Sequence, residues 1–191
     1  MFFKFRSQYL YRLIPPLAGL LFNTFFFQGC KMKPENSPDK LSVIQAMAAS
    51  HALRTPHIKN ITPSEILEIQ QNPTKKDSFL LVDVRPEEER KISIIPSSLS
   101  LESFQQKIQN QNSSLDQSRM IILYDTIGLR STQTIDSLQL NHLQVLNLKG
   151  GLLNWLWSGG KLVDQNNNEV RKVHVHSEPW NLVPENYQGI L

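Results

Sequence analysis

The sequence predicts an α/β fold with a mostly parallel central sheet and helices on both of its faces. Two observations support this class. Three short runs are predominantly apolar, at 79–84, 120–124 and 145–148, which is the composition of strands buried on both faces. The segments between them carry apolar residues at helical spacing, and such alternation favours parallel strands joined by crossover helices.

The expected elements alternate along the chain. Strands are expected at 58–61, 79–84, 98–101, 120–124 and 145–148. Helices are expected at 63–71, 102–109, 131–140 and 152–157. Because ligands of open parallel sheets bind beyond the carboxyl ends of the strands, we expect a site in the loop that begins at Asp125.

An export signal is expected at residues 1–29. The first 12 residues carry three basic side chains and no acidic one, an apolar stretch follows at 13–27, and a glycine closes the segment. This order is typical of a signal peptide. The apolar stretch is shorter than the roughly 20 residues of a membrane-spanning helix. An uncleaved signal anchor is the alternative interpretation.

The pair Gly29-Cys30 resembles the junction of a bacterial lipobox. The resemblance implies cleavage before Cys30 and attachment of lipid to it. The protein would then be anchored to a membrane of the bacterial cell envelope, with residues 30–39 as a tether. Cys30 is the only cysteine among the 191 residues, so an intramolecular disulfide and a resolving thiol are both excluded.

The charge balance excludes one class of partner. The chain has 20 Lys and Arg against 17 Asp and Glu, and the three excess cations all precede Cys30. The rest of the chain is therefore neutral overall, without the basic excess of a nucleic-acid-binding surface. We expect neither a nucleic-acid partner nor a bound cofactor.

A helical extension is expected at 40–55, ahead of the main domain. Leu41, Ile44, Met47 and Ala48 fall on one face of this helix. We expect this apolar stripe to pack against the domain. A helix that binds a partner protein is the alternative.

The loop after the strand at 120–124 has the properties of an anion site. A strand-to-helix turn points backbone N–H groups into a concavity, and the helix N-terminus adds partial positive charge. Gly128 can take a positive φ, Arg130 adds a planar cation, and Ser131 can cap the following helix. The expected anion-binding loop comprises Asp125, Thr126, Ile127, Gly128, Leu129, Arg130 and Ser131. An ordinary strand-to-helix connection is the alternative.

Four motifs together resemble the rhodanese-like domain family. In chain order they are D-V-R-x-x-x-E at 83–89, I-P at 95–96, a counterpart of the C-x-x-G-x-R-S loop at 125–131, and L-x-G-G-x-x-x-W at 148–155. The resemblance covers 56–163 and implies a single rhodanese-like domain there. It also implies that the loop is the counterpart of a sulfurtransferase active site.

The loop departs from the family's pattern at its first position. The family places a nucleophilic cysteine there, and this chain has Asp125. A carboxylate cannot carry a persulfide sulfur, so the resemblance implies that the nucleophile is lost. We expect the Asp125 carboxylate to fold into the N–H groups of its own loop. The alternative is that it turns outward into solvent.

Three functions compete at this stage. The first is a catalytically inactive, lipid-anchored module of the cell envelope that binds a protein partner or a small oxyanion, with a binding or regulatory role. The second is an enzyme related to sulfurtransferases or phosphatases in which Asp125 acts as phosphoryl acceptor or general base. The third is a scaffold whose loop binds nothing.

A C-terminal tail is expected at 164–191, folded back on the domain. His174 and His176 would share one face of a strand, but a third ligand is lacking, so no metal site is expected. The tail also resembles the V-H-P-Y-x-x-x-W ending of some rhodanese-like proteins, matching at Val173, His174 and Trp180. We expect Trp180 to be buried.

Overall fold

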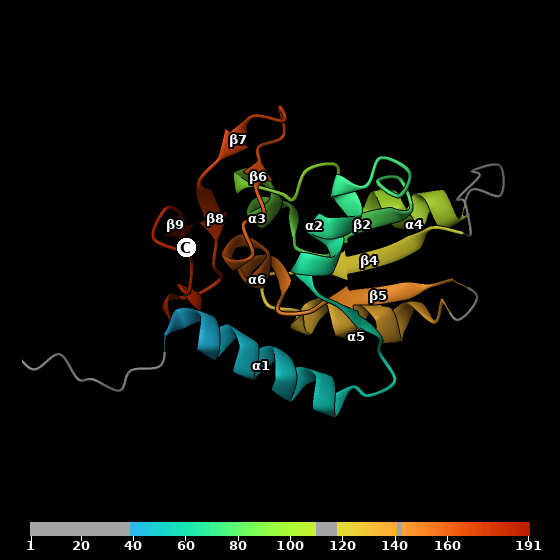
Figure 1. Cartoon of the computed structure of the whole chain (residues 1–191), viewed down its shortest axis with the longest axis horizontal. Coiled ribbons are helices and arrows are strands. Elements are labelled where there is room, and N and C mark those ends of the chain that lie inside the picture. The colour runs from blue at the N-terminus through green and yellow to red at the C-terminus, as the bar shows by residue number, and fades with distance from the viewer. Residues whose placement is uncertain (1–38, 110–117, 141–142) are drawn as a thin grey trace, which may run out of the picture. The chain divides into compact units, whose positions relative to one another are not determined.

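A five-stranded parallel sheet forms the centre of the protein (Figure 1). The computed structural model describes residues 39–109, 118–140 and 143–191. The strand order is β1-β5-β4-β2-β3. The strands are β1 Asn60–Ile61, β2 Phe79–Asp83, β3 Leu99–Ser100, β4 Met120–Tyr124 and β5 Val145–Leu148. The predicted α/β class with a mostly parallel sheet is confirmed.

Helices lie on both faces of the sheet. They are α1 Lys40–Arg54, α2 Pro63–Gln71, α3 Glu87–Ile92, α4 Leu101–Gln109, α5 Leu129–Leu138 and α6 Gly151–Trp157. Helices α2 to α5 connect the strands of the sheet. None of the described helices is long and apolar enough to span a membrane. The expected export signal, Cys30 and nearly all of the expected tether lie outside the described residues.

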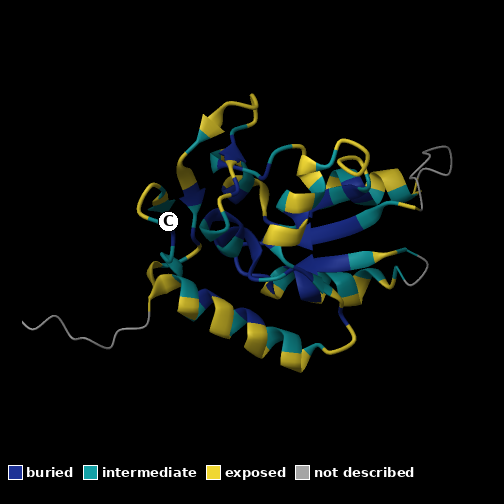
Figure 2. Ribbon diagram, in the orientation of Figure 1, coloured by how far each residue is buried: buried dark blue, intermediate teal, exposed yellow. Residues whose placement is uncertain are grey.

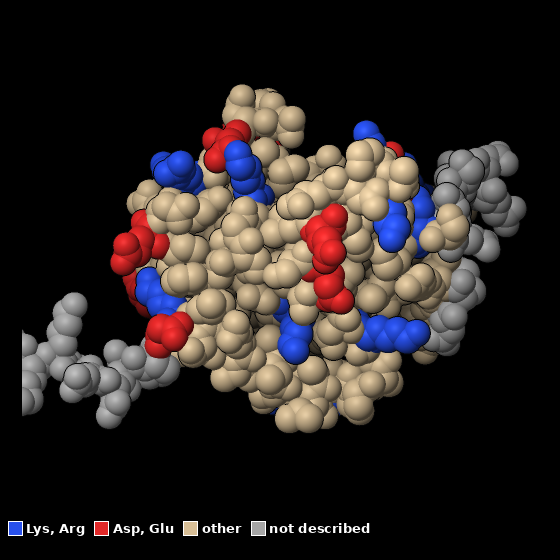
Figure 3. Space-filling view, viewed as in Figure 1, with Lys and Arg blue, Asp and Glu red and all other residues tan. Residues whose placement is uncertain are grey.

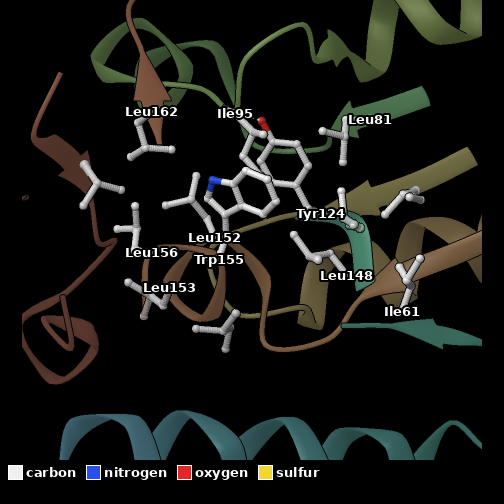
Figure 4. Close-up of a cluster of buried hydrophobic side chains, with 14 of the residues drawn as sticks. Ile61, Leu81, Ile95, Tyr124, Leu148, Leu152, Leu153, Trp155, Leu156 and Leu162 are labelled. Atoms are coloured by element: carbon white, nitrogen blue, oxygen red, sulfur yellow. Dashed lines mark hydrogen bonds between the residues drawn. The ribbon is translucent and has the colours of Figure 1, made fainter. Parts of the chain in front are cut away.

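Side chains alternate between two apolar layers because successive residues of a strand point to opposite faces. Leu81, Ile122 and Leu146 are register neighbours on one face, which α1, α2 and α6 cover. Figure 4 shows Trp155 of α6 within this layer. On the other face Val82 and Leu123 pack with α4 and α5. The strands are therefore buried on both faces, as Figure 2 shows for β4 and β5.

The predicted extension helix packs on the domain. Its Ile44 and Ala48 are buried, and Leu41 and Met47 are half-buried. Asp39 caps the helix, since its carboxylate accepts a hydrogen bond of 2.9 Å from the backbone N–H of Ser42. Packing of this stripe against the domain is therefore confirmed.

Several predicted boundaries need correction. β1 and β3 are two residues long instead of four, because only Asn60 and Ile61 pair with β5, and only Leu99 and Ser100 pair with β2. The helix predicted at 131–140 begins at Leu129, with Gly128 as its N-cap at φ 91°. Ser131 therefore lies inside the first turn and does not cap it.

Helix α3 was not predicted from the sequence. Its three consecutive glutamates occupy the first turn, and Arg90 and Lys91 occupy the last turn. This charge order complements the helix dipole, which stabilises so short a helix. The helix matters for function because it carries Glu89.

The C-terminal tail contributes to the core. Its β7 Glu169–Val170 pairs antiparallel with β6 Leu162–Val163 at the end of the domain, and its β8 Lys172–His174 pairs parallel with β9 Gln188–Ile190. A short 3-10 helix covers Glu178–Trp180. The Trp157 indole N–H of α6 donates a 2.8 Å hydrogen bond to the Leu182 carbonyl, which ties the tail to the domain.

Two predictions about the tail are wrong. β8 ends at His174, and the backbone turns at His176 with φ 67°, so the two histidines do not share a strand face. Trp180 is half-buried, not buried, because one side of it borders a pocket. The reason in both cases is a turn that the alternating pattern did not reveal.

Acidic and basic side chains are mixed on the surface. On the face drawn in Figure 3, the visible described residues show no broad patch of one sign. This distribution agrees with the neutral balance of the chain after its N-terminal segment.

Candidate functional site

The loop that begins at Asp125 leaves the carboxyl end of the central strand β4. Its backbone is held by the start of α6, where the N–H groups of Leu152 and Leu153 donate to the carbonyls of Asp125 and Thr126 at 2.9 and 3.0 Å. Gly151 lies against the same backbone, and a Cβ there would come within 2.4 Å of the Asp125 carbonyl oxygen. The glycine pair before α6 therefore allows the loop and the helix to make contact.

The Asp125 carboxylate points into its own loop. Asp125 as a whole is 1% exposed. Oδ1 accepts hydrogen bonds from the backbone N–H of Ser131 at 3.2 Å and from the Ser131 hydroxyl at 2.8 Å. Oδ2 accepts from the backbone N–H of Ile127 at 3.4 Å. The alternative prediction, in which Asp125 turns outward into solvent, is therefore wrong. The N–H groups of the loop already bind the Asp125 carboxylate.

A chain of polar side chains continues from the loop across the sheet. The Ser131 hydroxyl also lies 2.5 Å from Asn147 Oδ1, so its single proton lies between two acceptors. Asn147 donates through Nδ2 to Asn60 Oδ1 at 2.8 Å. Asp125 is thereby tied to β5 and β1, which explains why Ser131 is buried instead of capping the helix.

Arg130 is engaged by carboxylates of the protein itself. Its Nη1 and Nη2 donate to Glu89 Oε1 and Oε2 at 2.7 and 2.9 Å, a bidentate pair. Nη2 also donates to Thr126 Oγ1 at 3.2 Å, and Nε lies 3.7 Å from Asp125 Oδ2. The sequence predicted that the Arg130 guanidinium would bind an external oxyanion, but its partners are groups of the protein itself.

The ion pair fixes the charge of both groups. Burial raises the pKa of Glu89, but the hydrogen bonds and charge of Arg130, with smaller effects of Arg85 and His174, outweigh it, so that pKa lies below its ordinary value. Burial lowers the pKa of Arg130, and Glu89 and Asp125 more than compensate. Glu89 is thus an anion and Arg130 a cation at neutral pH.

A pocket of about 180 Å³ opens at the outer side of the loop. Asp125, Thr126, Ile127, Leu129, Arg130, His176 and Trp180 line it. The C-terminal tail supplies the last two of these residues. Gly128 and Ser131 are buried and contribute to the loop's conformation instead. The structure therefore brings the predicted loop and the predicted tail together at one site.

Comparison with known proteins decides the family. The family model described as the rhodanese-like domain matches residues 62–157. The chain belongs to the rhodanese-like domain family. No curated protein matches it.

Several solved structures resemble the chain at low identity. A thiosulfate sulfurtransferase from Pseudomonas aeruginosa is 16% identical with a TM-score of 0.48, and the match covers 75% of this chain and 26% of that one. A rhodanese-like domain protein from Staphylococcus aureus is 23% identical with a TM-score of 0.41, over 58% and 97% of the two chains. The As-Sb reductase from Leishmania major is 14% identical with a TM-score of 0.44, over 59% and 92%.

A second ion pair supports the rhodanese-like loop from inside the domain. Asp83 ends β2, and its carboxylate binds Arg85 Nη2 at 2.7 Å, with neither side chain exposed. Arg85 Nη2 also donates to the Ser93 carbonyl. The Arg85 guanidinium lies 5.8 Å from the ring centroid of Tyr124, the last residue of β4. This pair fixes the position from which the loop departs.

Three parts of the site were missed by sequence reasoning. Glu89 had a signal, because it closes the D-V-R-x-x-x-E motif, but its pairing with a residue 41 positions away did not follow from spacing. Gly151 also belonged to a matched motif, whose packing role became clear only in three dimensions. His176 had no signal for this site. No cluster of three or more His, Cys, Asp or Glu that could hold a metal occurs among the described residues.

Proposed function

We propose that this protein is a rhodanese-like module that binds a ligand or partner and does not transfer sulfur. In the family resemblance Asp125 takes the place of the nucleophilic cysteine. The observation that carries the proposal is that its carboxylate occupies the N–H groups of the loop. The sole cysteine, Cys30, precedes the domain that the family model matches. No residue of the loop can therefore carry a sulfane sulfur.

The lipid anchor is part of the same proposal. The sequence of residues 1–30 supports export and lipidation at Cys30, which would keep the domain at a membrane of the bacterial cell envelope. A module held at a membrane can act through a partner there without turnover. Incorporation of labelled palmitate that is lost in Cys30→Ser would support the anchor, and equal labelling of both proteins would contradict it.

The geometry gives the enzyme alternative no support. Both oxygens of Asp125 accept hydrogen bonds and the residue is 1% exposed, so a phosphoryl group has poor access to it. The pocket beside the loop does favour binding over a scaffold without a ligand, because it is open, partly apolar and bordered by Trp180.

A sulfurtransferase assay tests the proposal directly. The purified full chain is incubated with thiosulfate and cyanide, and thiocyanate formation is measured beside an active rhodanese as positive control. We expect no turnover above the rate without protein. Robust turnover that follows the protein through purification would overturn the proposal.

A further inference from the structure

The ion pairs around the loop leave one negative charge in excess. These ion pairs form two separate groups. In the first, Asp83 and Glu87 pair with Arg85 and Arg90, and the group is neutral. In the second, Glu89 and Asp125 share Arg130, so its formal charge is −1 and the excess lies at the loop.

The hydrogen-bond donors that would hold an anion are already in use. The N–H groups of Ile127 and Ser131 bind the Asp125 carboxylate. Arg130 donates to Glu89 through both terminal nitrogens. An external oxyanion would have to displace one of these internal carboxylates and leave it buried without its partners, which is costly. The pocket therefore disfavours anions.

The remaining walls suit a cation that carries apolar groups. Ile127 and Leu129 line the pocket, and Leu129 is 39% exposed. Trp180 adds an indole, the aromatic side chain that attracts cations most strongly. A volume of about 180 Å³ is below that of pockets for drug-sized ligands, roughly 300 Å³ or more. A headgroup-sized ion fits these limits.

We infer that the pocket binds a small alkylammonium ion, such as one with a trimethylammonium group. Asp125, which lines the pocket, and Glu89, which pairs with the pocket residue Arg130, together exceed the charge of that guanidinium, and Trp180 and Leu129 contact the methyl groups. The inference rests on the proposed function in that it treats the loop as a binding site and not as a site of sulfur transfer. His176 of the tail also lines the pocket.

A charge-matched pair of ligands tests the inference. Isothermal titration of the full chain compares choline with 3,3-dimethylbutan-1-ol, in which carbon replaces the charged nitrogen, and with thiosulfate. We expect choline to bind at least about tenfold more tightly than its neutral analogue, and thiosulfate not to bind. Equal binding of choline and the neutral analogue, or preference for thiosulfate, would overturn the inference.

Variants locate the site. Trp180→Leu should weaken choline binding about fivefold or more, since an aromatic wall contributes on the order of 1 kcal/mol or more to a desolvated cation. Trp180→Phe should restore part of it. Asp125→Asn should also weaken choline binding. Asp136→Asn is the control and should leave it unchanged, because Asp136 pairs with His57 and lies outside this pocket. Unchanged choline affinity in folded Trp180→Leu and Asp125→Asn would contradict the assignment.

Two further arms separate the outcomes. Vesicles of phosphatidylcholine that bind the chain and release it on addition of free choline would support a lipid headgroup as the source. Choline binding without vesicle binding would support a soluble ion. The thiosulfate assay is run on the same protein to separate the two claims. A chain that is inactive and does not prefer choline contradicts only the inference. A chain that turns over thiosulfate contradicts the proposed function.

Discussion

Two arginine–carboxylate pairs lie near the carboxyl edge of the sheet and differ in their exposure. Both have an N···O distance of 2.7 Å. In the Arg85–Asp83 pair neither side chain is exposed. In the Arg130–Glu89 pair, Glu89 is 3% exposed but Arg130 is 33% exposed and borders the pocket. Equal contact distance therefore does not mean equal role.

The difference separates structure from recognition. Arg85 is enclosed between Asp83 and the Ser93 carbonyl, so no ligand can compete for it. Arg130 and its partners face a space that a ligand can enter. We conclude that the Arg85–Asp83 pair, the enclosed pair, holds the starting point of the loop. The Arg130–Glu89 pair, the open pair, sets the charge that a ligand meets.

The largest expected effect comes from breaking the enclosed pair. Arg85→Met should destabilise the domain by about 3–5 kcal/mol, because Asp83 is left as a buried charge without its bidentate partner. Urea unfolding at neutral pH measures this loss. The double variant Arg85→Met, Asp83→Leu should recover part of the stability, since neither charge then remains.

A loss below about 1 kcal/mol in Arg85→Met would contradict this assignment. It would mean that Arg90, whose Nη1 lies 3.5 Å from Asp83 Oδ2, compensates for the missing guanidinium. The two pairs would then not differ in the way described.

Breaking the open pair should cost less. Glu89→Gln removes a charged acceptor from Arg130, but Arg130 can still reach solvent and Asp125, so we expect a loss of about 2 kcal/mol. Urea unfolding again gives the value. Glu88→Gln, one residue earlier on α3 and exposed, is the matched control and should be near neutral. Equal losses in both variants would contradict the pairing.

The same pair should be visible in the pH dependence of stability. Because the pKa of Glu89 is lowered in the folded protein, its stabilisation is complete above the ordinary value of 4.5 and is lost as pH falls through the folded pKa. Unfolding of the wild type should therefore lose more stability below pH 4.5 than that of Glu89→Gln. Burial and Arg54 lower the pKa of His51 below its ordinary value of 6.5, so its contribution is lost as pH falls below 6.5, before that of Glu89 and in both proteins alike. Parallel curves for the two proteins would contradict this effect.

The sequence predicted the parts of this site that depend on local chemistry. The apolar run of β4, the following turn and the motif order were sufficient to place the loop at the carboxyl edge. Local chemistry could not reveal that Glu89 neutralises Arg130, because the two lie on separate helices, α3 and α5. Local chemistry therefore predicted a site for an external anion, whereas carboxylates of the protein itself occupy that site.

The tail shows the same limit. Alternation predicted a strand through His176, but the backbone turns there with a positive φ, which non-glycine residues rarely adopt. That turn carries the chain toward the loop, where Trp180 borders the pocket. An alternating apolar and polar pattern indicates which face of a strand is buried. It does not indicate where in the fold the irregular segment after the strand packs.

The smallest expected effect on stability, and the sharpest test of the loop, is Asp125→Cys. The loop's geometry is held by α6 through Leu152 and Leu153 and not by Asp125 alone, so we expect a stability change of about 1 kcal/mol or less. The N–H groups of Ile127 and Ser131 would then be free to stabilise a thiolate, with Arg130 nearby. The thiol should be alkylated by iodoacetamide faster at neutral pH than free cysteine.

Asp125→Cys should also form thiocyanate from thiosulfate and cyanide at a rate clearly above that without protein, which the wild type should not exceed. Asp125→Ser, which offers an oxygen nucleophile of similar size, should stay inactive because it cannot hold a sulfane sulfur. A folded Asp125→Cys protein with the reactivity of an ordinary thiol would mean that Glu89 cancels the effect of Arg130 at this position. The open ion pair, more than the missing cysteine, would then be what keeps this rhodanese-like loop from sulfur transfer.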